Sequence, residues 1–464
     1  MNEPNNTGTL LESLAHYANR LDPGSVPQSV HEQAALCLLD TVGCIVAGSR
    51  VAESGLLFDA EAKRYGAFEA WPAEVTARVL GYFGDTLELN DLIGGHSSIG
   101  VVTAALAAGR DRKISGEELL TGIVAGTEVT ARLYESAVGR FKRYSEGGSV
   151  MVSYFNAVGA AAALSVMSSF DDTTTTNAMA IAASMNSWCP AEVIFGQGGT
   201  IKPMLFGGNP AACAVLAAGY AAEGLTGPRG IIESPIGMMA GLATSFDPSK
   251  ILDTERWYIT APQRKMHAAC GYTHSSIDAA GSLHLSVEEQ GRVESIDVAV
   301  PAFFKEAVGK EGRPKSANDA RFHLGYVVSL ALQGLYPILP EHTEDFDRIF
   351  GQGLTASLSD KVRIVPNDGI AAGGSKPYNI ARVTVHFNDG EQRSQTCTSP
   401  IGSSENPMSG DDVVNKFIRL VSPAASEETA VELAERILKI GTAADVRPIS
   451  EAVLELVRQE MVKR

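Results

Sequence analysis

The stretch Lys265-Met266-His267-Ala268-Ala269-Cys270-Gly271-Tyr272-Thr273-His274 lies where this sequence changes from a helical to a mixed pattern. Up to about residue 245, apolar residues recur at three- and four-residue steps in segments rich in Ala and Gly. This spacing is typical of amphipathic helices, and small side chains let such helices pack closely. The predicted helices include 9–21, 27–48, 101–109, 117–134, 153–168 and 174–187.

After this stretch, polar and apolar residues alternate over 293–300, which predicts a half-buried strand, and three further short segments are predicted as strands. Two of these segments flank Asp389-Gly390, a turn pair that is typical of a β-hairpin. Helical spacing returns at 276–287, at 317–333 and beyond residue 409. We therefore expect a smaller α/β domain over residues 263–396, with strands at 293–300, 362–365, 382–387 and 392–398.

Composition and charge exclude several function classes. The 464-residue chain has a formal net charge of −16, whereas binding to nucleic acid or to an anionic membrane needs a basic surface. Its six cysteines are scattered, without the close pairs of zinc or iron–sulfur sites. Residues 1–8 lack the positive charge of a targeting segment, and no uncharged apolar run reaches the roughly 20 residues of a membrane span. We therefore expect a reduced, cytoplasmic protein that binds neither nucleic acid nor a membrane.

The quoted stretch also concentrates reactive side chains. Lys265 could supply an ammonium group for a carboxylate, and its two histidines and Cys270 could move a proton. A plainer interpretation is a polar, solvated loop that caps the following helix. The segment alone favours neither.

Other segments decide between these interpretations. They are Leu38–Gly48, Gly199-Thr200-Ile201-Lys202-Pro203 with Gly207–Ala212, Ala320–Tyr326, and Asn406–Ser409 ahead of Lys416-Phe417. Together with the quoted stretch, and in this order, they resemble the MmgE/PrpD family from about residue 10 to about residue 420. Members of that family include 2-methylcitrate dehydratase, cis-aconitate decarboxylase and iminodisuccinate epimerase.

The resemblance implies a mainly α fold. A large all-helical body would be built from both chain ends, residues 1–262 and 397–464, with an inserted α/β lid at 263–396. It also implies a homodimer that forms through the Ala- and Gly-rich helices of the body, whose apolar surface a monomer would leave exposed.

The resemblance places an active site between body and lid. His96, after Gly94-Gly95, matches a family histidine, and Lys202 and Lys265 match family lysines suited to substrate carboxylates. Tyr326 matches a family tyrosine, with a core tyrosine as the rival interpretation. We expect these residues and Cys270 to be catalytic, and substrate contacts from Asp91, His274 and Arg321.

Three departures from the family pattern bear on the reaction. Where family dehydratases and decarboxylases show Asp-x-Asp-Asp-Thr, this chain has Glu88-Leu89-Asn90-Asp91-Leu92 and so lacks the threonine. No histidine lies near 150–153, where the family carries its second one. Cys270 stands where the decarboxylase has a histidine. A dehydratase must protonate its leaving hydroxyl, so these losses weaken the dehydration hypothesis.

Three hypotheses follow. A lyase, either a dehydratase or a decarboxylase of a small di- or tricarboxylate, is favoured by the resemblance. An epimerase of an amino- or imino-dicarboxylate, with Cys270 and a lysine or histidine on opposite faces of one carbon, is favoured by the lost residues. A non-catalytic member is disfavoured, because four residues are retained together: His96, Lys202, Lys265 and Tyr326. No metal-binding, phosphate-binding or nucleotide-binding motif appears, so we expect neither a metal nor a cofactor.

Overall fold

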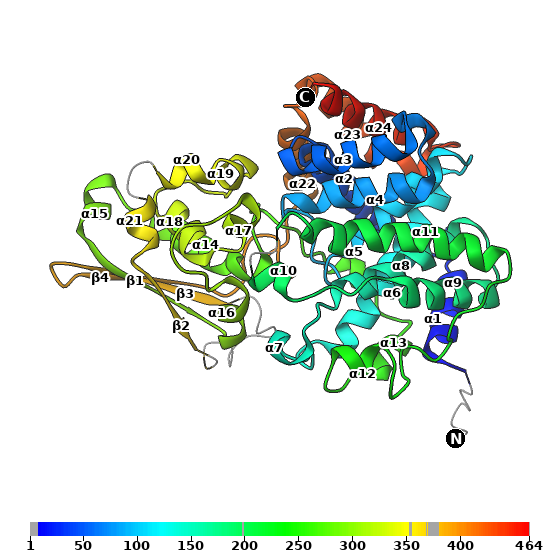
Figure 1. The fold of residues 1–464 in the computed structure, drawn as a ribbon, viewed down its shortest axis with the longest axis horizontal. Helices are drawn as coiled ribbons and strands as arrows, with labels where there is room; N and C mark the ends of the chain where they lie inside the picture. The colour runs from blue at the N-terminus through cyan, green and yellow to red at the C-terminus, as the bar shows by residue number, and fades with distance from the viewer. Residues whose placement is uncertain (1–7, 197–198, 352–354, 368, 370–379, 464) are drawn as a thin grey trace.

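The computed structural model describes residues 8–196, 199–351, 355–367, 369 and 380–463. Residues 1–7, whose composition bears on targeting, lie outside this range. The chain forms a large helical body and a smaller part with a four-stranded sheet (Figure 1). Helices from both chain ends build the body, so the predicted mainly α fold with an inserted α/β part is confirmed.

Long helices form the body, and several start with a capping side chain. Ser115 and Glu118, for example, make a capping box at the start of α6. The body consists of α1 (Leu10–Asn19), α2 (Gln28–Ser49), α3 (Ala52–Tyr65), α4 (Ala73–Thr86), α5 (Ser97–Arg110), α6 (Gly116–Ala137), α8 (Val152–Met167), α9 (Asp172–Met185), α11 (Asn209–Ala222), α22 (Gly410–Val421), α23 (Glu427–Leu438) and α24 (Arg447–Val462), with the shorter α7 (Tyr144–Gly147), α10 (Glu192–Phe195), α12 (Met238–Leu242) and α13 (Pro248–Leu252).

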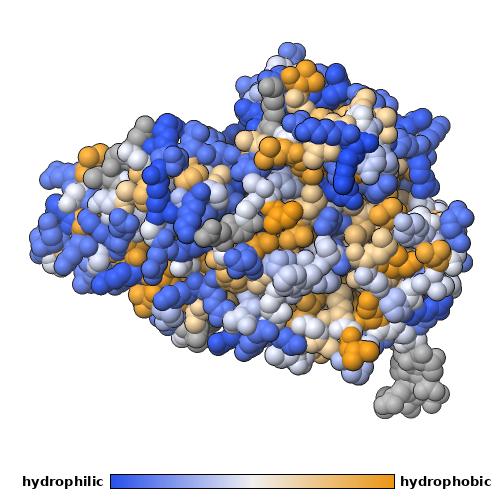
Figure 2. Space-filling model, viewed as in Figure 1, coloured by the Kyte–Doolittle hydropathy of each residue, from blue (hydrophilic) through white to orange (hydrophobic). Residues whose placement is uncertain are grey.

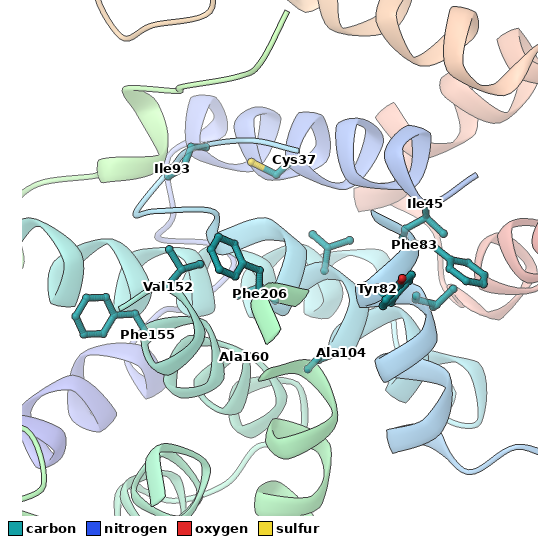
Figure 3. Close-up of a cluster of buried hydrophobic side chains, with 14 of the residues drawn as sticks. Cys37, Ile45, Tyr82, Phe83, Ile93, Ala104, Val152, Phe155, Ala160 and Phe206 are labelled. Atoms are coloured by element: carbon teal, nitrogen blue, oxygen red, sulfur yellow. The ribbon is translucent and has the colours of Figure 1, made fainter. Parts of the chain in front are cut away.

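Small residues let the central helices α6 and α8 touch. A Cβ atom on Gly159 would lie 1.8 Å from Thr130 Oγ1, so only glycine fits there. Figure 3 shows how side chains of α2, α4, α5 and α8 and Phe206 gather in one buried cluster. The helices Gln28–Ser49 and Met204–Ala222 are long and apolar enough to cross a membrane, but most of each is buried inside the body, as in core helices.

The C-terminal helices return to the N-terminal ones. Lys416 on α22 forms a buried ion pair with Asp40 on α2, at 2.7 Å. The same ammonium donates to the carbonyl of Leu89, also at 2.7 Å. This lysine therefore joins the two chain ends to the loop that follows α4.

The sheet has the strand order β2-β1-β3-β4. β1 (Val293–Val300) pairs in parallel with β2 (Val362–Pro366) and antiparallel with β3 (Ala381–Phe387), and β3 and β4 (Gln392–Cys397) form the predicted hairpin. The surrounding helices are α14 (His274–Leu283), α15 (Val287–Arg292), α16 (Ala302–Val308), α17 (Ala317–Arg321), α18 (Leu324–Leu332), α19 (Pro340–Glu344), α20 (Phe346–Phe350) and α21 (Thr355–Ser359).

Two predicted lid helices differ in detail. The helix predicted at 317–333 is divided into α17 and α18, because His323 between them is extended and its side chain caps α18. The helix predicted at 276–287 ends at Leu283, since His284 has a left-handed backbone. Local capping, rather than hydrophobic spacing, sets both boundaries.

Candidate active site

A cavity of about 250 Å³ lies between the body and the lid. This volume suits a small molecule. Helices α6, α7 and α8 and the loop before α5 line it from the body, and the quoted stretch lines it from the lid. Its lining residues are Glu88, Leu92, Gly95, His96, Tyr134, Glu135, Val138, Tyr144, Val150, Met151, Val152, Ile194, Phe206, Gln263, Cys270, Gly271, Tyr272 and Phe322.

The predicted His96 lines this cavity. It stands immediately before α5 with a left-handed backbone (φ 78°), after Gly94 (φ 55°) and Gly95 (φ 73°). A Cβ atom on Gly94 would lie 2.7 Å from the Cα atom of Ala131, so this loop is pressed against α6. Asn156 of α8 donates to the carbonyl of His96 at 3.0 Å. Such strain at a non-glycine residue is common at functional sites.

The imidazole of His96 is held neutral. Burial lowers its pKa well below the usual 6.5, and the nearby charge of Lys265 lowers it further. Its Nδ1 lies 3.1 Å from the side-chain amide nitrogen of Asn90. When that nitrogen donates, His96 carries its proton on Nε2; with the amide reversed, Nδ1 donates and Nε2 is a free base. The amide can therefore serve either tautomer.

The predicted lysines meet around one carboxylate. Glu88 forms ion pairs with Lys202 and, at 2.6 Å, with Lys265. Asp85 lies 2.8 Å from Lys202. Both lysines are fully buried, which lowers the pKa of each to about 8, and burial raises the pKa of Asp85. Neither lysine lines the cavity itself; both contact its lining residue Glu88, and Lys202 also lies 4.2 Å from the ring centroid of Phe206, another lining residue.

Cys270 lines the cavity from the lid. Its backbone N–H donates to the carbonyl of Arg321 at 2.9 Å, which fixes the turn that carries the thiol. Burial raises the pKa of the thiol, so Cys270 is a neutral thiol at pH 7. Next to it, the hydroxyls of Tyr272 and Tyr144 lie 3.2 Å apart and bridge lid and body.

The other predicted residues lie outside the cavity lining. Asp91 is buried, accepts from Ser98, and has its pKa raised to about 6 by burial. His274 contacts the carbonyl of Ala269 at 3.1 Å. Tyr326 donates to the carbonyl of His342 at 2.6 Å in the lid core, and Arg321 forms an ion pair with Glu344. Their contacts support the loops and helices around the site.

Sequence reasoning missed several site residues. Glu88 and Asn90 stand in the segment that departs from the family's Asp-x-Asp-Asp-Thr, where the sequence predicts a substrate contact for Asp91 and the loss of a threonine at Leu92 but no role for these two residues. Leu92 packs against Gly271, and its N–H donates to the carbonyl of Gln263 at 2.7 Å. Tyr144 carried no sequence signal. Within the described ranges, no group of three or more His, Cys, Asp or Glu side chains is placed to hold a metal ion.

Comparison with known families agrees with this geometry. The MmgE/PrpD N-terminal domain matches residues 12–251, and the MmgE/PrpD C-terminal domain matches residues 267–440. This chain belongs to the MmgE/PrpD family. The cavity lies where these two matched regions meet.

Several fungal proteins are similar to this chain. A cis-aconitate decarboxylase-like protein, oryM, of Aspergillus oryzae (strain ATCC 42149 / RIB 40) is 24% identical, over 95% of this chain and 96% of its own. A cis-aconitate decarboxylase of Aspergillus terreus is 21% identical, over 95% of each chain. A further one, from A. terreus strain NIH 2624 / FGSC A1156, is 22% identical over 94% of each. These likenesses support a lyase-like enzyme at the level of the family.

Proposed function

We propose that this MmgE/PrpD protein is a cofactor-independent lyase, a decarboxylase or dehydratase, that removes CO2 or a proton next to a carboxylate of a small acid. The observation that carries the proposal is the neutral imidazole of His96 at the cavity wall. The resemblance favours a di- or tricarboxylate, as the names of the fungal relatives suggest for those proteins.

The chemistry needs a group that takes or returns a proton at carbon. A neutral imidazole accepts a proton near neutral pH, and the same group, once protonated, returns it. Removal of a proton adds a negative charge to the substrate, and loss of CO2 moves the charge of the departing carboxylate onto carbon. The hydroxyls of Tyr144 and Tyr272, in a largely apolar cavity, could donate to that charge.

One observation favours an epimerase as the second candidate. His96 and Cys270 both line the cavity, and they come from the body and the lid respectively. Two such groups on opposite faces of one carbon are what a two-base epimerase requires. The neutral thiol of Cys270 would then donate the proton while His96 removes one.

Paired substitutions test the proposal and separate the two candidates. His96→Ala should lower kcat by roughly 10²–10⁴-fold in either case, since it removes the acid–base group. Cys270→Ser keeps the shape but is a far weaker acid. It should leave lyase turnover within a few-fold of wild type, and it should nearly abolish epimerase turnover. Steady-state kinetics on both variants would contradict the proposal if neither differed from wild type.

A further inference from the structure

The segments that line the cavity divide into a polar and an apolar group. The loop before α5 contributes Glu88 and His96, and the lid stretch contributes Cys270 and Tyr272. The start of α8, the helix α10, the short helix Met204–Gly208 and one lid residue contribute apolar side chains instead. We call this second set the apolar wall; it consists of Val150, Met151, Val152, Ile194, Phe206 and Phe322.

The apolar wall lies next to the acid–base group. Asn156, one helical turn after Val152 on α8, donates to the carbonyl of His96 at 3.0 Å and to that of Phe206 at 3.2 Å. The rings of His96 and Phe206 meet edge to face, with centroids 5.9 Å apart. Val152 and Phe206 belong to the buried cluster of Figure 3. A substrate carbon within reach of the imidazole therefore has apolar surface beside it.

The backbone holds this wall in place. The N–H of Val150 donates to the carbonyl of Cys189 at 2.8 Å. The preceding residue, Ser149, pairs with Pro190 in an isolated β-bridge. The start of α8 is thus fixed to a neighbouring segment of the body. Because the apolar surface exists before a ligand binds, binding does not have to order it.

The chain departs from the family pattern at this wall. The family carries its second histidine near 150–153, where this chain has Val150, Met151, Val152 and Ser153. A carboxylate or hydroxyl buried against these apolar side chains would lose its water without gaining a hydrogen bond. An apolar group buried there would instead be stabilised by the loss of its contact with water.

We infer that the substrate is a di- or tricarboxylate that carries an apolar branch larger than a methyl group next to its reacting carbon, and that the apolar wall binds this branch. The inference rests on the proposed function, because it takes this cavity as the site of a carboxylate lyase. It adds what the substrate carries besides its carboxylates. A methyl group contacts few of the wall's side chains, whereas a longer alkyl chain contacts side chains of both body and lid.

Binding to the unmodified protein tests this inference directly. 2-Methylsuccinate and 2-butylsuccinate have the same two carboxylates and differ by three methylene groups in the branch. Calorimetry or ligand-observed NMR should give 2-butylsuccinate a dissociation constant at least about tenfold lower, since each methylene group leaves water for the wall. Equal or weaker binding of 2-butylsuccinate, or binding of neither acid, would overturn the inference.

A variant tests the role of Val152. Val152→Thr keeps the shape of the side chain but places a hydroxyl in the wall. It should weaken binding of 2-butylsuccinate about fivefold and change that of 2-methylsuccinate by less than about twofold. The matched control, Val166→Thr, makes the same change near the other end of α8, outside the cavity lining, and should leave both affinities unchanged.

Circular dichroism establishes that each variant is folded. An equal loss for both acids, or a loss in the control as well, would contradict the assignment of Val152. If Val152→Thr does not fold, the comparison of the two acids on the wild-type protein decides.

The inference and the proposed function fail in different measurements. The order of the two affinities decides the inference, whether or not either acid is turned over. Loss of CO2 or water decides the function. Tighter binding of 2-butylsuccinate without chemistry on any acid would uphold the inference and reject the lyase. Conversion of an unbranched acid, with equal affinities for the two succinates, would do the reverse.

Discussion

At the scale of single residues, the pair His96 and Asn90 carries the acid–base chemistry that we propose. The family pattern carries an aspartate at the third position of Asp-x-Asp-Asp-Thr, where this chain has Asn90. A carboxylate beside Nδ1 would stabilise the imidazolium form, whereas the amide does not. The amide, burial and the charge of Lys265 therefore all favour the neutral ring.

The pH dependence of activity should report the pKa of His96 and the effect of its neighbour Asn90 on that pKa. A base must be unprotonated, so kcat/KM falls as the pH falls through the pKa of His96. Because burial lowers that pKa below 6.5, the acid limb should lie below pH 6.5. Asn90→Asp adds a negative charge beside the ring and should move the limb to higher pH. The pH profiles of wild type, Asn90→Asp and the uncharged control Asn90→Ala check this, and identical limbs for the first two would refute it.

At the scale of elements, the loop between α4 and α5 positions the site. Glu88, Gly94, Gly95 and His96 all have positive φ angles there. Lys416 of α22 holds the same loop through the carbonyl of Leu89. This strained loop therefore holds together segments that lie far apart in the sequence.

Substitution of Gly94 should disturb both stability and catalysis. In Gly94→Ala, the alanine would have to adopt a left-handed backbone, which costs about 1–2 kcal/mol. Its Cβ atom would also lie 2.7 Å from the Cα atom of Ala131 on α6. We expect a lower Tm and a kcat reduced by an order of magnitude or more, since His96 shifts with the loop. The matched control is Gly291→Ala on α15, where a Cβ meets nothing within 4 Å. If Gly94→Ala behaved like this control, the packing argument would be wrong.

Hydrophobic periodicity predicted most elements, because burial imposes it. The alternation at 293–300 gave β1 with its observed bounds, and the Asp389-Gly390 pair gave the hairpin. Periodicity could not place the break at His323, which depends on a side-chain cap. Nor could it show that Glu88 bridges two lysines, because Glu88 is more than one hundred residues from either in sequence, with separations of 114 and 177.

At the scale of the whole molecule, the insertion of the lid between two parts of the body creates the cavity. Figure 2 shows hydrophobic residues on the surface of the body, whereas the surface of the lid is mostly hydrophilic. The Ala-rich α8 is almost wholly buried, whereas α11 keeps Val215 and Leu216 partly exposed and Tyr220 40% exposed. Of the small-residue helices, α11 is therefore the one suited to the homodimer that the resemblance implies.

Sedimentation should detect that homodimer. We expect a dimer at micromolar concentration that Leu216→Asp weakens, because the substitution places a charge in an apolar contact. Val287→Asp on the lid, at a position 79% exposed, is the control and should leave the dimer intact. A stable wild-type monomer at micromolar concentration would reject the proposed assembly.

Proton NMR in D2O tests most directly the central claim, that this cavity performs proton chemistry next to a carboxylate. The wild-type protein is incubated with citrate, 2-methylcitrate, cis-aconitate and an amino-dicarboxylate, with His96→Ala as the matched control. The lyase account predicts that at least one acid loses either CO2, with a solvent deuteron in the product, or water, and that His96→Ala greatly decreases this conversion. Deuterium uptake without net conversion would identify the epimerase instead. Undiminished conversion by His96→Ala would contradict the account.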